Sequence, residues 1–442
     1  MARRTRWLCE LIKFALHVDP AEKTLLAWPR GSLGAIPGDS PVLLRLGRHF
    51  MQLRILPPFA SLLGLVLALL CAAPAGAQLF ETKATQAFMI DVDTGTVLFA
   101  KDPDKPIPPA SMAKLMTMEV VFNALKAKRI TLDDTFVVSE NAWRTGGAPS
   151  GTSTMFAKLK SEVRVEDLIQ GVTVQAANDG CIVLAEGMAG SEANFAAQMT
   201  DRARQLGLSK STFVNSTGLP ADGQQTTVRE LTMLALHLWR DYPEFFHYYG
   251  QPDFTWNKIA QRNRNPLIAM GIEADGFVAG ASEQAGFGLV GTVSHNGIRV
   301  IAALTGLAND RERSEEARKL LDWGSRSFQK TEIFAKDEVV GEAQVFGGAK
   351  SGLALKAKGP VDIFLPIANR DKLTARIVYQ GPVSAPVEEG QPVGELRVWI
   401  GDTLSQQTPL YAAESVKVGT LPQRALDAAK ELAVGWLRQK HL

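Results

Sequence analysis

The sequence predicts an α/β body, in which helices surround an antiparallel sheet, followed by a small all-β domain. Apolar, strand-like runs near residues 90 and 290 enclose a middle region with helical periodicity. From Thr331 to Val418 the chain changes to short Val/Ile/Leu segments separated by Gly, Pro, Asn and Asp, which is typical of regular short strands. With 442 residues, 46% of them apolar and 21% charged, the chain can form packed cores in two or three domains.

Residues 51–77 read as a secretory signal peptide. A basic start containing Arg54 precedes an apolar run over residues 55–73, and Ala75-Gly76-Ala77 gives a small-x-small cleavage site after Ala77. A membrane anchor is the alternative, but the apolar run is only marginally long enough and is flanked by prolines. Because signal peptides normally begin a chain, residues 1–50 read as a non-native extension, with Met51 as the true start.

Charge and cysteine content narrow the function of the remaining chain. Residues 78–442 carry 39 basic and 42 acidic side chains without a basic run, so there is no case for nucleic-acid binding. Cys181 is the one cysteine after the leader, which leaves no intrachain disulfide to form. No Cys/His spacing suggests a metal site.

The secondary-structure elements follow from local patterns. A β-hairpin is expected where two apolar runs, 87–92 and 97–100, flank an Asp-Thr-Gly turn. Helices are expected at 165–174, 180–188, 192–206, 228–240 and 311–322, and strands at 286–293 and 298–304. The last stretch, 421–442, has the periodicity of an amphipathic helix. It is either an interfacial helix on an anionic membrane or an ordinary docking helix.

Ser111 and Lys114 form a Ser-x-x-Lys spacing where a proline-rich run gives way to helical periodicity. Ser111 is therefore expected at a helix N-terminus, with Lys114 one turn further on the same face. A partly buried lysine with a lowered pKa can take the serine proton, and the helix N-terminus offers N–H groups to an oxyanion. Taken alone, the same four residues also fit an N-cap serine followed by a solvated lysine.

Together these features resemble the low-molecular-weight penicillin-binding proteins that act as D-alanyl-D-alanine carboxypeptidases. Supporting segments lie at 165–169, 175–181, 213–219 and 263–267. The resemblance implies a penicilloyl-serine-transferase (β-lactamase/D,D-peptidase-like) domain at 78–330. It also implies a small β-rich domain at 331–420 and an amphipathic C-terminal helix at 421–442.

The resemblance also implies an active site of three elements: Ser-x-x-Lys, a Ser-x-Asn turn, and Lys-Thr-Gly on a strand beside the nucleophile. The first is intact, with Ser111 as nucleophile and Lys114 as base, and Asn178 matches the asparagine of the second. Substrate-binding positions carried over are Arg264, which matches the arginine of Asn-Arg-Asn, and Gly280 and Ser282 on the third element. No metal or organic cofactor is implied, and β-lactams are expected to acylate the same serine.

Two of the three elements depart from the family pattern. Ala176 replaces the serine of Ser-x-Asn. Val278, Ala279 and Ala281 replace the lysine, threonine and histidine of Lys-Thr-Gly-His, in a frame fixed by flanking Asp-Gly and Ala-Gly-Phe-Gly segments. Lost charge-assisted hydrogen bonds typically cost about 1.5–3 kcal/mol each.

The functional prediction is a periplasmic serine-type carboxypeptidase that trims peptidoglycan stem peptides, weakened by these departures. The alternative is a non-catalytic protein of the same fold that binds cell-wall peptide or a partner. A serine β-lactamase fits less well, because those enzymes also use the missing third element. The C-terminal helix adds an expected contact with the inner-membrane surface.

Overall fold

The structure, a computed structural model, describes residues 17–18, 80–367 and 373–439. The predicted leader at 51–77 lies outside the described residues, as does the predicted extension at 1–50 apart from the short strand β1 (His17–Val18). Among the described helices, none combines the length and apolar character needed to cross a membrane.

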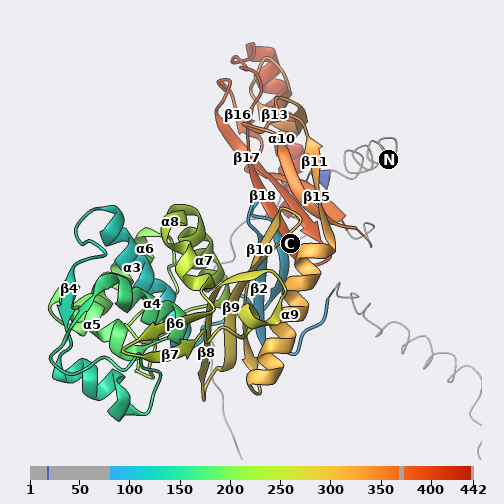
Figure 1. Cartoon of the computed structure of the whole chain (residues 1–442). Helices are drawn as coiled ribbons and strands as arrows, with labels where there is room; N and C mark the ends of the chain where they lie inside the picture. Colours follow the sequence, from blue (N-terminus) through green and yellow to red (C-terminus); the bar gives the residue numbers. More distant parts are fainter. Residues whose placement is uncertain (1–16, 19–79, 368–372, 440–442) are drawn as a thin grey trace, which may run out of the picture. The chain divides into compact units, whose positions relative to one another are not determined.

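An antiparallel sheet of five strands forms the centre of the first domain (Figure 1). The strands are β2 (Gln86–Asp91), β3 (Val97–Lys101), β8 (Ala274–Ser282), β9 (Gly286–His295) and β10 (Ile298–Leu307). Their order is β3-β2-β10-β9-β8, so β8 is an edge strand, paired with β9 in a register that places Gly280 opposite Gly288. The predicted hairpin and the two later strands are confirmed.

Both faces of this sheet are covered by helices. Successive side chains of a strand point to opposite faces, so each face contributes its own apolar residues to a separate cluster. Leu289 and Val300 belong to an apolar cluster that includes side chains of α9 (Asp310–Arg326). Val290 and Ile301 belong to a second cluster that includes α7 (Val228–Asp241). Figure 1 shows these two helices on opposite sides of the strands.

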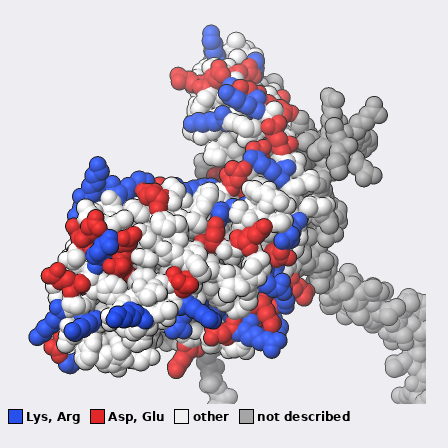
Figure 2. Space-filling model, in the orientation of Figure 1, with Lys and Arg blue, Asp and Glu red and all other residues white. Residues whose placement is uncertain are grey.

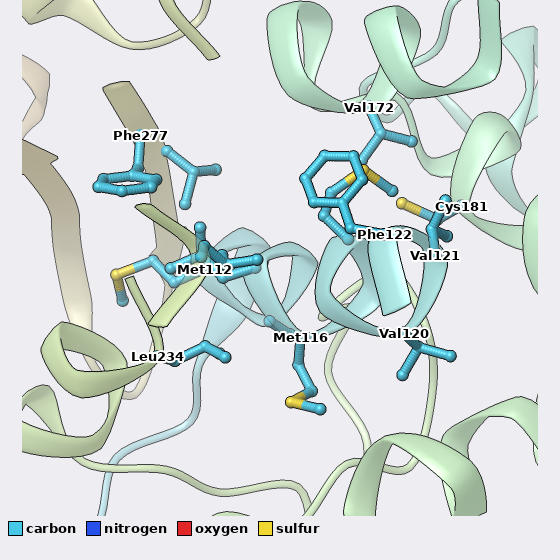
Figure 3. Close-up of a cluster of buried hydrophobic side chains, with 14 of the residues drawn as sticks. Met112, Met116, Val120, Val121, Phe122, Val172, Cys181, Leu234 and Phe277 are labelled. Carbon is cyan, nitrogen blue, oxygen red and sulfur yellow. The ribbon is translucent and has the colours of Figure 1, made fainter. Parts of the chain in front are cut away.

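The helical part of the domain follows the predicted periodicity closely. Its main helices are α3 (Lys114–Lys126), α4 (Val165–Gln175), α5 (Asn178–Ala189) and α6 (Glu192–Gln205). Smaller elements are β4 (Thr135–Val137), β5 (Glu162–Arg164), α8 (Pro243–Phe246), β6 (Asp253–Trp256) and β7 (Ile259–Arg262). Helix α3 is buried along most of its length, and Figure 3 shows Met116, Val121 and Phe122 inside the surrounding apolar cluster.

A buried ionic network fixes α3 to the helices beside it. Glu119 is 0% exposed and accepts hydrogen bonds from Arg202 of α6 and from the Tyr242 hydroxyl, both at 2.9 Å. His237 of α7 lies 3.2 Å from the same oxygen. Burial alone would raise the pKa of Glu119, but its hydrogen bonds with His237, Arg202 and Tyr242 outweigh burial and lower it.

The C-terminal domain is all β, as predicted. Its strands are β11 (Phe328–Phe334), β12 (Val339–Phe346), β13 (Gly352–Lys356), β14 (Val361–Pro366), β15 (Leu373–Tyr379), β16 (Val383–Ser384), β17 (Pro392–Ile400) and β18 (Thr403–Ala412). The larger sheet has the order β1-β15-β17-β18-β13-β12-β16, and β11 pairs with β14. Alternate residues such as Leu353 and Leu355 of β13 are fully buried in its apolar core.

The predicted terminal helix is present as α10 (Leu421–Gln439). Three of its leucines are exposed: Leu421, Leu426 and Leu432 are 78%, 57% and 77% exposed. The Asp427 carboxylate accepts a hydrogen bond from the Gly347 N–H at 3.1 Å, which ties the helix to the end of β12.

Candidate active site

Ser111 lies in a short 3-10 turn (Ala110–Ala113) that leads directly into α3, as the proline-to-helix transition predicts. Two glycines enclose this turn. A Cβ on Gly218, whose φ is +81°, would fall 1.8 Å from the Ala110 carbonyl oxygen. A Cβ on Gly280 of β8 would fall 3.0 Å from the Ser111 nitrogen, so strand β8 runs directly beside the nucleophile turn. The carried-over position Gly280 is therefore in contact with Ser111.

The Ser111 and Lys114 side chains meet as predicted. Lys114 Nζ lies 3.1 Å from Ser111 Oγ and donates a second hydrogen bond to the Thr217 carbonyl oxygen at 2.6 Å. Lys114 is 2% exposed, and burial lowers the pKa of its ammonium group. Among the described residues no carboxylate forms an ion pair with it. A lysine without a counter-ion at this distance is suited to act as general base.

Asn178, the third predicted catalytic residue, begins α5 and is 4% exposed. Its Nδ2 donates to Thr152 Oγ1 at 2.9 Å, whereas its Oδ1 is buried and has no hydrogen-bond partner among the residues that the structure describes. Helix α5 and helix α3, which begins with Lys114, contribute side chains to the same buried apolar cluster. Asn178 therefore lies at the N-terminus of a helix that packs in the same core as α3.

The turn between α4 and α5 holds Ala176 in the left-handed region, with φ 56°. The side chain at this position is 4% exposed and offers no hydrogen-bonding group. The following Asp179 is 0% exposed, and its carboxylate accepts hydrogen bonds from Thr154 Oγ1 and from the Met155 and Ala157 N–H groups at 2.6–3.0 Å. The Asn-Asp pair therefore fixes the 153–157 loop against the site.

Strand β8 presents an apolar surface where the family pattern has polar groups. Val278 and Ala279 are 6% and 8% exposed. Val278 shares a face with Gly280, and thus with Ser111, and joins the apolar cluster that includes Met112 and Phe277 (Figure 3). Ala279 packs in the cluster on the other face of the sheet. In the folded protein these two positions are therefore filled by buried apolar side chains, and they present neither a cation nor a hydroxyl to a substrate.

Arg264 does not reach the Ser111–Lys114 pair through any hydrogen bond in the described structure. It is exposed, donates from Nε to Gln175 Oε1 at 3.3 Å and lines a cavity of about 560 Å³. Arg262 and Arg313 line the same cavity, where Asp310 is the lone carboxylate. Arg313 is 8% exposed and pairs with Asp310 at 2.6 Å, and its Nε is buried without a hydrogen-bond partner in the described part of the chain.

Ser282 lies at the end of β8, where its Oγ accepts a hydrogen bond from the Ala285 N–H at 3.0 Å. It lines a second cavity, of about 850 Å³. Ala110 and Gly218, which flank the nucleophile, and Ala281 also line this cavity. The space therefore opens beside the turn that carries Ser111.

The described surface carries no patch of a single charge on the face drawn (Figure 2), and the described residues form no metal site. On the face drawn in Figure 2, basic and acidic side chains are interspersed. Within the described part of the chain, no three His, Cys, Asp or Glu side chains come together in a way that could hold a metal ion. The site thus offers serine, lysine and amide groups as its chemistry.

Three contributors were not predicted from the sequence. They are the Thr217 carbonyl that binds Lys114, the Thr152 hydroxyl that binds Asn178, and Arg313 in the cavity of Arg264. A backbone carbonyl has no residue-type signal, and Thr152 is one of several hydroxyl residues in a Gly/Ser/Thr-rich loop. Arg313 lies in a strongly charged helix segment that reads as a solvated face.

Two family models match the chain. One, described as D-alanyl-D-alanine carboxypeptidase, matches residues 72–309, and another, described as the C-terminal domain of penicillin-binding protein 5, matches residues 328–418. D-alanyl-D-alanine carboxypeptidase DacC of Escherichia coli K12 is 36% identical over 342 residues, which are 77% of this chain and 86% of that protein. DacA of the same organism is 30% identical over 359 residues, or 80% and 89% of the two chains.

Solved structures agree with these matches. Penicillin-binding protein 5 of Haemophilus influenzae is 31% identical, with a TM-score of 0.63 over 77% of this chain and 99% of its own. Penicillin-binding protein 6B of Escherichia coli is 31% identical, with a TM-score of 0.59 over 76% and 97%. Together with the Ser111–Lys114 geometry, these matches identify the chain as a member of the serine-type D-alanyl-D-alanine carboxypeptidase family.

Proposed function

We propose that Ser111 attacks the D-Ala–D-Ala peptide bond of a peptidoglycan stem peptide and forms an acyl-enzyme. The observation that carries this is the 3.1 Å contact between Ser111 Oγ and a buried Lys114 that forms no ion pair within the described part of the chain. Lys114 Nζ takes the serine proton as Oγ bonds to the carbonyl carbon, and returns it to the amine of the departing D-alanine. Water then hydrolyses the ester, with Lys114 as base again.

The terminal carboxylate of the substrate needs a cationic partner, since desolvating an isolated carboxylate is costly. Strand β8 offers none at Val278 or Ala279. The cavity lined by Arg262, Arg264 and Arg313 carries three guanidinium groups against one carboxylate. Guanidinium groups bind carboxylates well, so this cavity is the place we propose for the substrate carboxylate.

A non-catalytic role remains the second candidate, and the apolar residues at 176, 278 and 279 favour it. In that case the 850 Å³ cavity would bind cell-wall peptide without cleavage. The two functions differ in one observable, the covalent intermediate on Ser111.

The experiment is to incubate the purified protein with a fluorescent penicillin and to locate any adduct by mass spectrometry. Labelling of wild type on Ser111, with no labelling of Ser111→Ala, supports the catalytic proposal. Release of D-alanine from a pentapeptide then gives the turnover rate. A folded wild-type protein that binds pentapeptide by calorimetry but is never labelled would establish the binding function instead.

We also propose that the protein acts in the periplasm, with α10 lying on the inner-membrane surface. The support is the predicted signal peptide together with the exposed Leu421, Leu426 and Leu432. Co-sedimentation with anionic lipid vesicles tests the helix. Wild type should sediment, and a variant with all three leucines changed to serine should stay in the supernatant. Equal sedimentation of both proteins would contradict the proposal.

A further inference from the structure

The Asn178 side chain, the Thr152 and Ser150 hydroxyls and the Gly147 carbonyl form a chain of hydrogen bonds in which each group donates to the next. Ser150 Oγ donates to the Gly147 carbonyl at 2.7 Å, which uses its one proton. The Ser150 and Thr152 hydroxyls are 2.7 Å apart, so the proton between them must come from Thr152. Thr152 Oγ1 can then only accept from the side chain of Asn178, which lies 2.9 Å away.

This direction fixes which end of the Asn178 amide faces Thr152. Only the NH₂ group can donate, so Nδ2 is turned to Thr152 and Oδ1 to the opposite side. There Oδ1 is buried, has no hydrogen-bond partner among the described residues, and lies at the start of α5, which packs in the same core as α3 and its Lys114. Buried amide oxygens are normally paired, so an unpaired one at the start of the helix that packs with α3 indicates an acceptor that is used only during the reaction.

The loop itself is held by other contacts. The Asp179 carboxylate binds Thr154, Met155 and Ala157, and the Asn178 N–H donates to the Ser153 carbonyl at 2.8 Å. Thr152 is exposed, and its hydroxyl contributes to none of these bonds. Removing that hydroxyl should therefore free the amide to rotate and leave the backbone of the loop in place.

We propose that Thr152 is a positioning residue that orients Asn178, so that Oδ1 accepts a hydrogen bond from the Lys114 ammonium formed when Ser111 gives up its proton. The inference rests on the proposed acyl-enzyme reaction. It assigns to Thr152 and Ser150 an orienting role in a site whose turn carries Ala176 in place of a hydroxyl residue.

The test measures fluorescent-penicillin acylation, and kcat and KM for a D-Ala-D-Ala peptide, in Thr152→Val and Thr152→Ser. Thr152→Val keeps the shape but loses the hydroxyl, and kcat and acylation should each fall about tenfold with KM within about twofold. Thr152→Ser should restore both rates to near wild type. Ser150→Ala, which frees the direction of the Thr152 hydroxyl, should have a smaller effect of the same kind.

Thr131→Val is the matched control, since it removes an exposed threonine hydroxyl that binds Asp134 rather than the site. It should match wild type, and thermal unfolding should show all variants folded. Wild-type rates in Thr152→Val, a Thr152→Ser variant as slow as Thr152→Val, or a change in KM alone would overturn the proposal. Failure of wild type to be labelled at all would instead refute the acyl-enzyme reaction.

Discussion

Restoring a cation to strand β8 should increase carboxypeptidase activity, and the structure says how. Val278 lies on the face of β8 that Gly280 presses against the Ser111 nitrogen. The substitution Val278→Lys therefore projects an ammonium group on the nucleophile's side of the strand. Ala279→Thr adds a hydroxyl, but on the face that packs in the cluster with Leu289.

The expected gain follows from the bonds regained. A charge-assisted hydrogen bond to the substrate carboxylate is worth about 1.5–3 kcal/mol, or roughly 10- to 150-fold in kcat/KM. The cavity lined by Arg262, Arg264 and Arg313 already supplies positive charge. We therefore expect the gain in kcat/KM of Val278→Lys to lie near the lower end of this range, at about tenfold. The cost is stability: Val278 is 6% exposed, and an uncompensated buried charge costs about 3–5 kcal/mol.

The assay is D-alanine release from a pentapeptide, with thermal unfolding measured on the same samples. Val278→Met is the control for side-chain length without charge, and Ala279→Thr alone shows what the hydroxyl contributes. An equal gain in Val278→Met would show that shape, not charge, limits the reaction. No gain in a folded Val278→Lys/Ala279→Thr double variant would refute the alignment of β8 with the third family element.

Three further predictions concern the nucleophile and its support. Acylation should increase with pH and level off below about pH 10.4, the usual lysine pKa, because burial favours the neutral Lys114 amine; a profile still rising there would contradict this. Gly218→Ala should slow acylation about tenfold or more, since its Cβ would fall 1.8 Å from the Ala110 oxygen. The control Gly207→Ala also has a positive φ, +79°, but meets nothing within 4 Å, so equal losses of acylation would count against the clash. Glu119→Gln should lower the free energy of unfolding by about 1.5–3 kcal/mol, because the buried carboxylate accepts a charge-assisted hydrogen bond from the partly buried Arg202 that the amide cannot match. In the wild-type protein the pKa of Glu119 is lowered, so its ionised carboxylate contributes fully to folding stability above about pH 4.3, the usual glutamate pKa. This contribution is lost as the pH falls through the pKa of Glu119 in the folded state. Denaturant titrations at several pH values check this, and an unchanged wild-type-minus-variant difference would contradict it.

The sequence was sufficient to predict the helices and strands and the position of the nucleophile, because these depend on local patterns. Periodicity places α4 through α7 within a few residues, and the proline-to-helix transition places Ser111 at the start of α3. The remaining parts of the site come from residues far apart in the chain. The carbonyl of Thr217 reaches Lys114 across 103 residues, and no side-chain pattern encodes a backbone oxygen. Arg313 joins Arg264 only because α9 and the β6–β7 region meet at one cavity.

Apart from Ala176 in the turn before α5, the departures from the family pattern lie on strand β8, in one half of the site. The half that activates the nucleophile consists of Ser111, Lys114, the Thr217 carbonyl and the glycines that enclose the turn, and its contacts are complete. The half that would hold the substrate carboxylate on β8 has become apolar at Val278 and Ala279, both buried in well-packed clusters. Replacing polar groups by apolar ones leaves no buried charge unpaired, so these changes cost little in folding. The two halves depend on different residues and can therefore fail separately. Acylation by a strained β-lactam, which relies mainly on the nucleophile, should therefore depend less on the residues at 278 and 279 than D-alanine release from a peptide does.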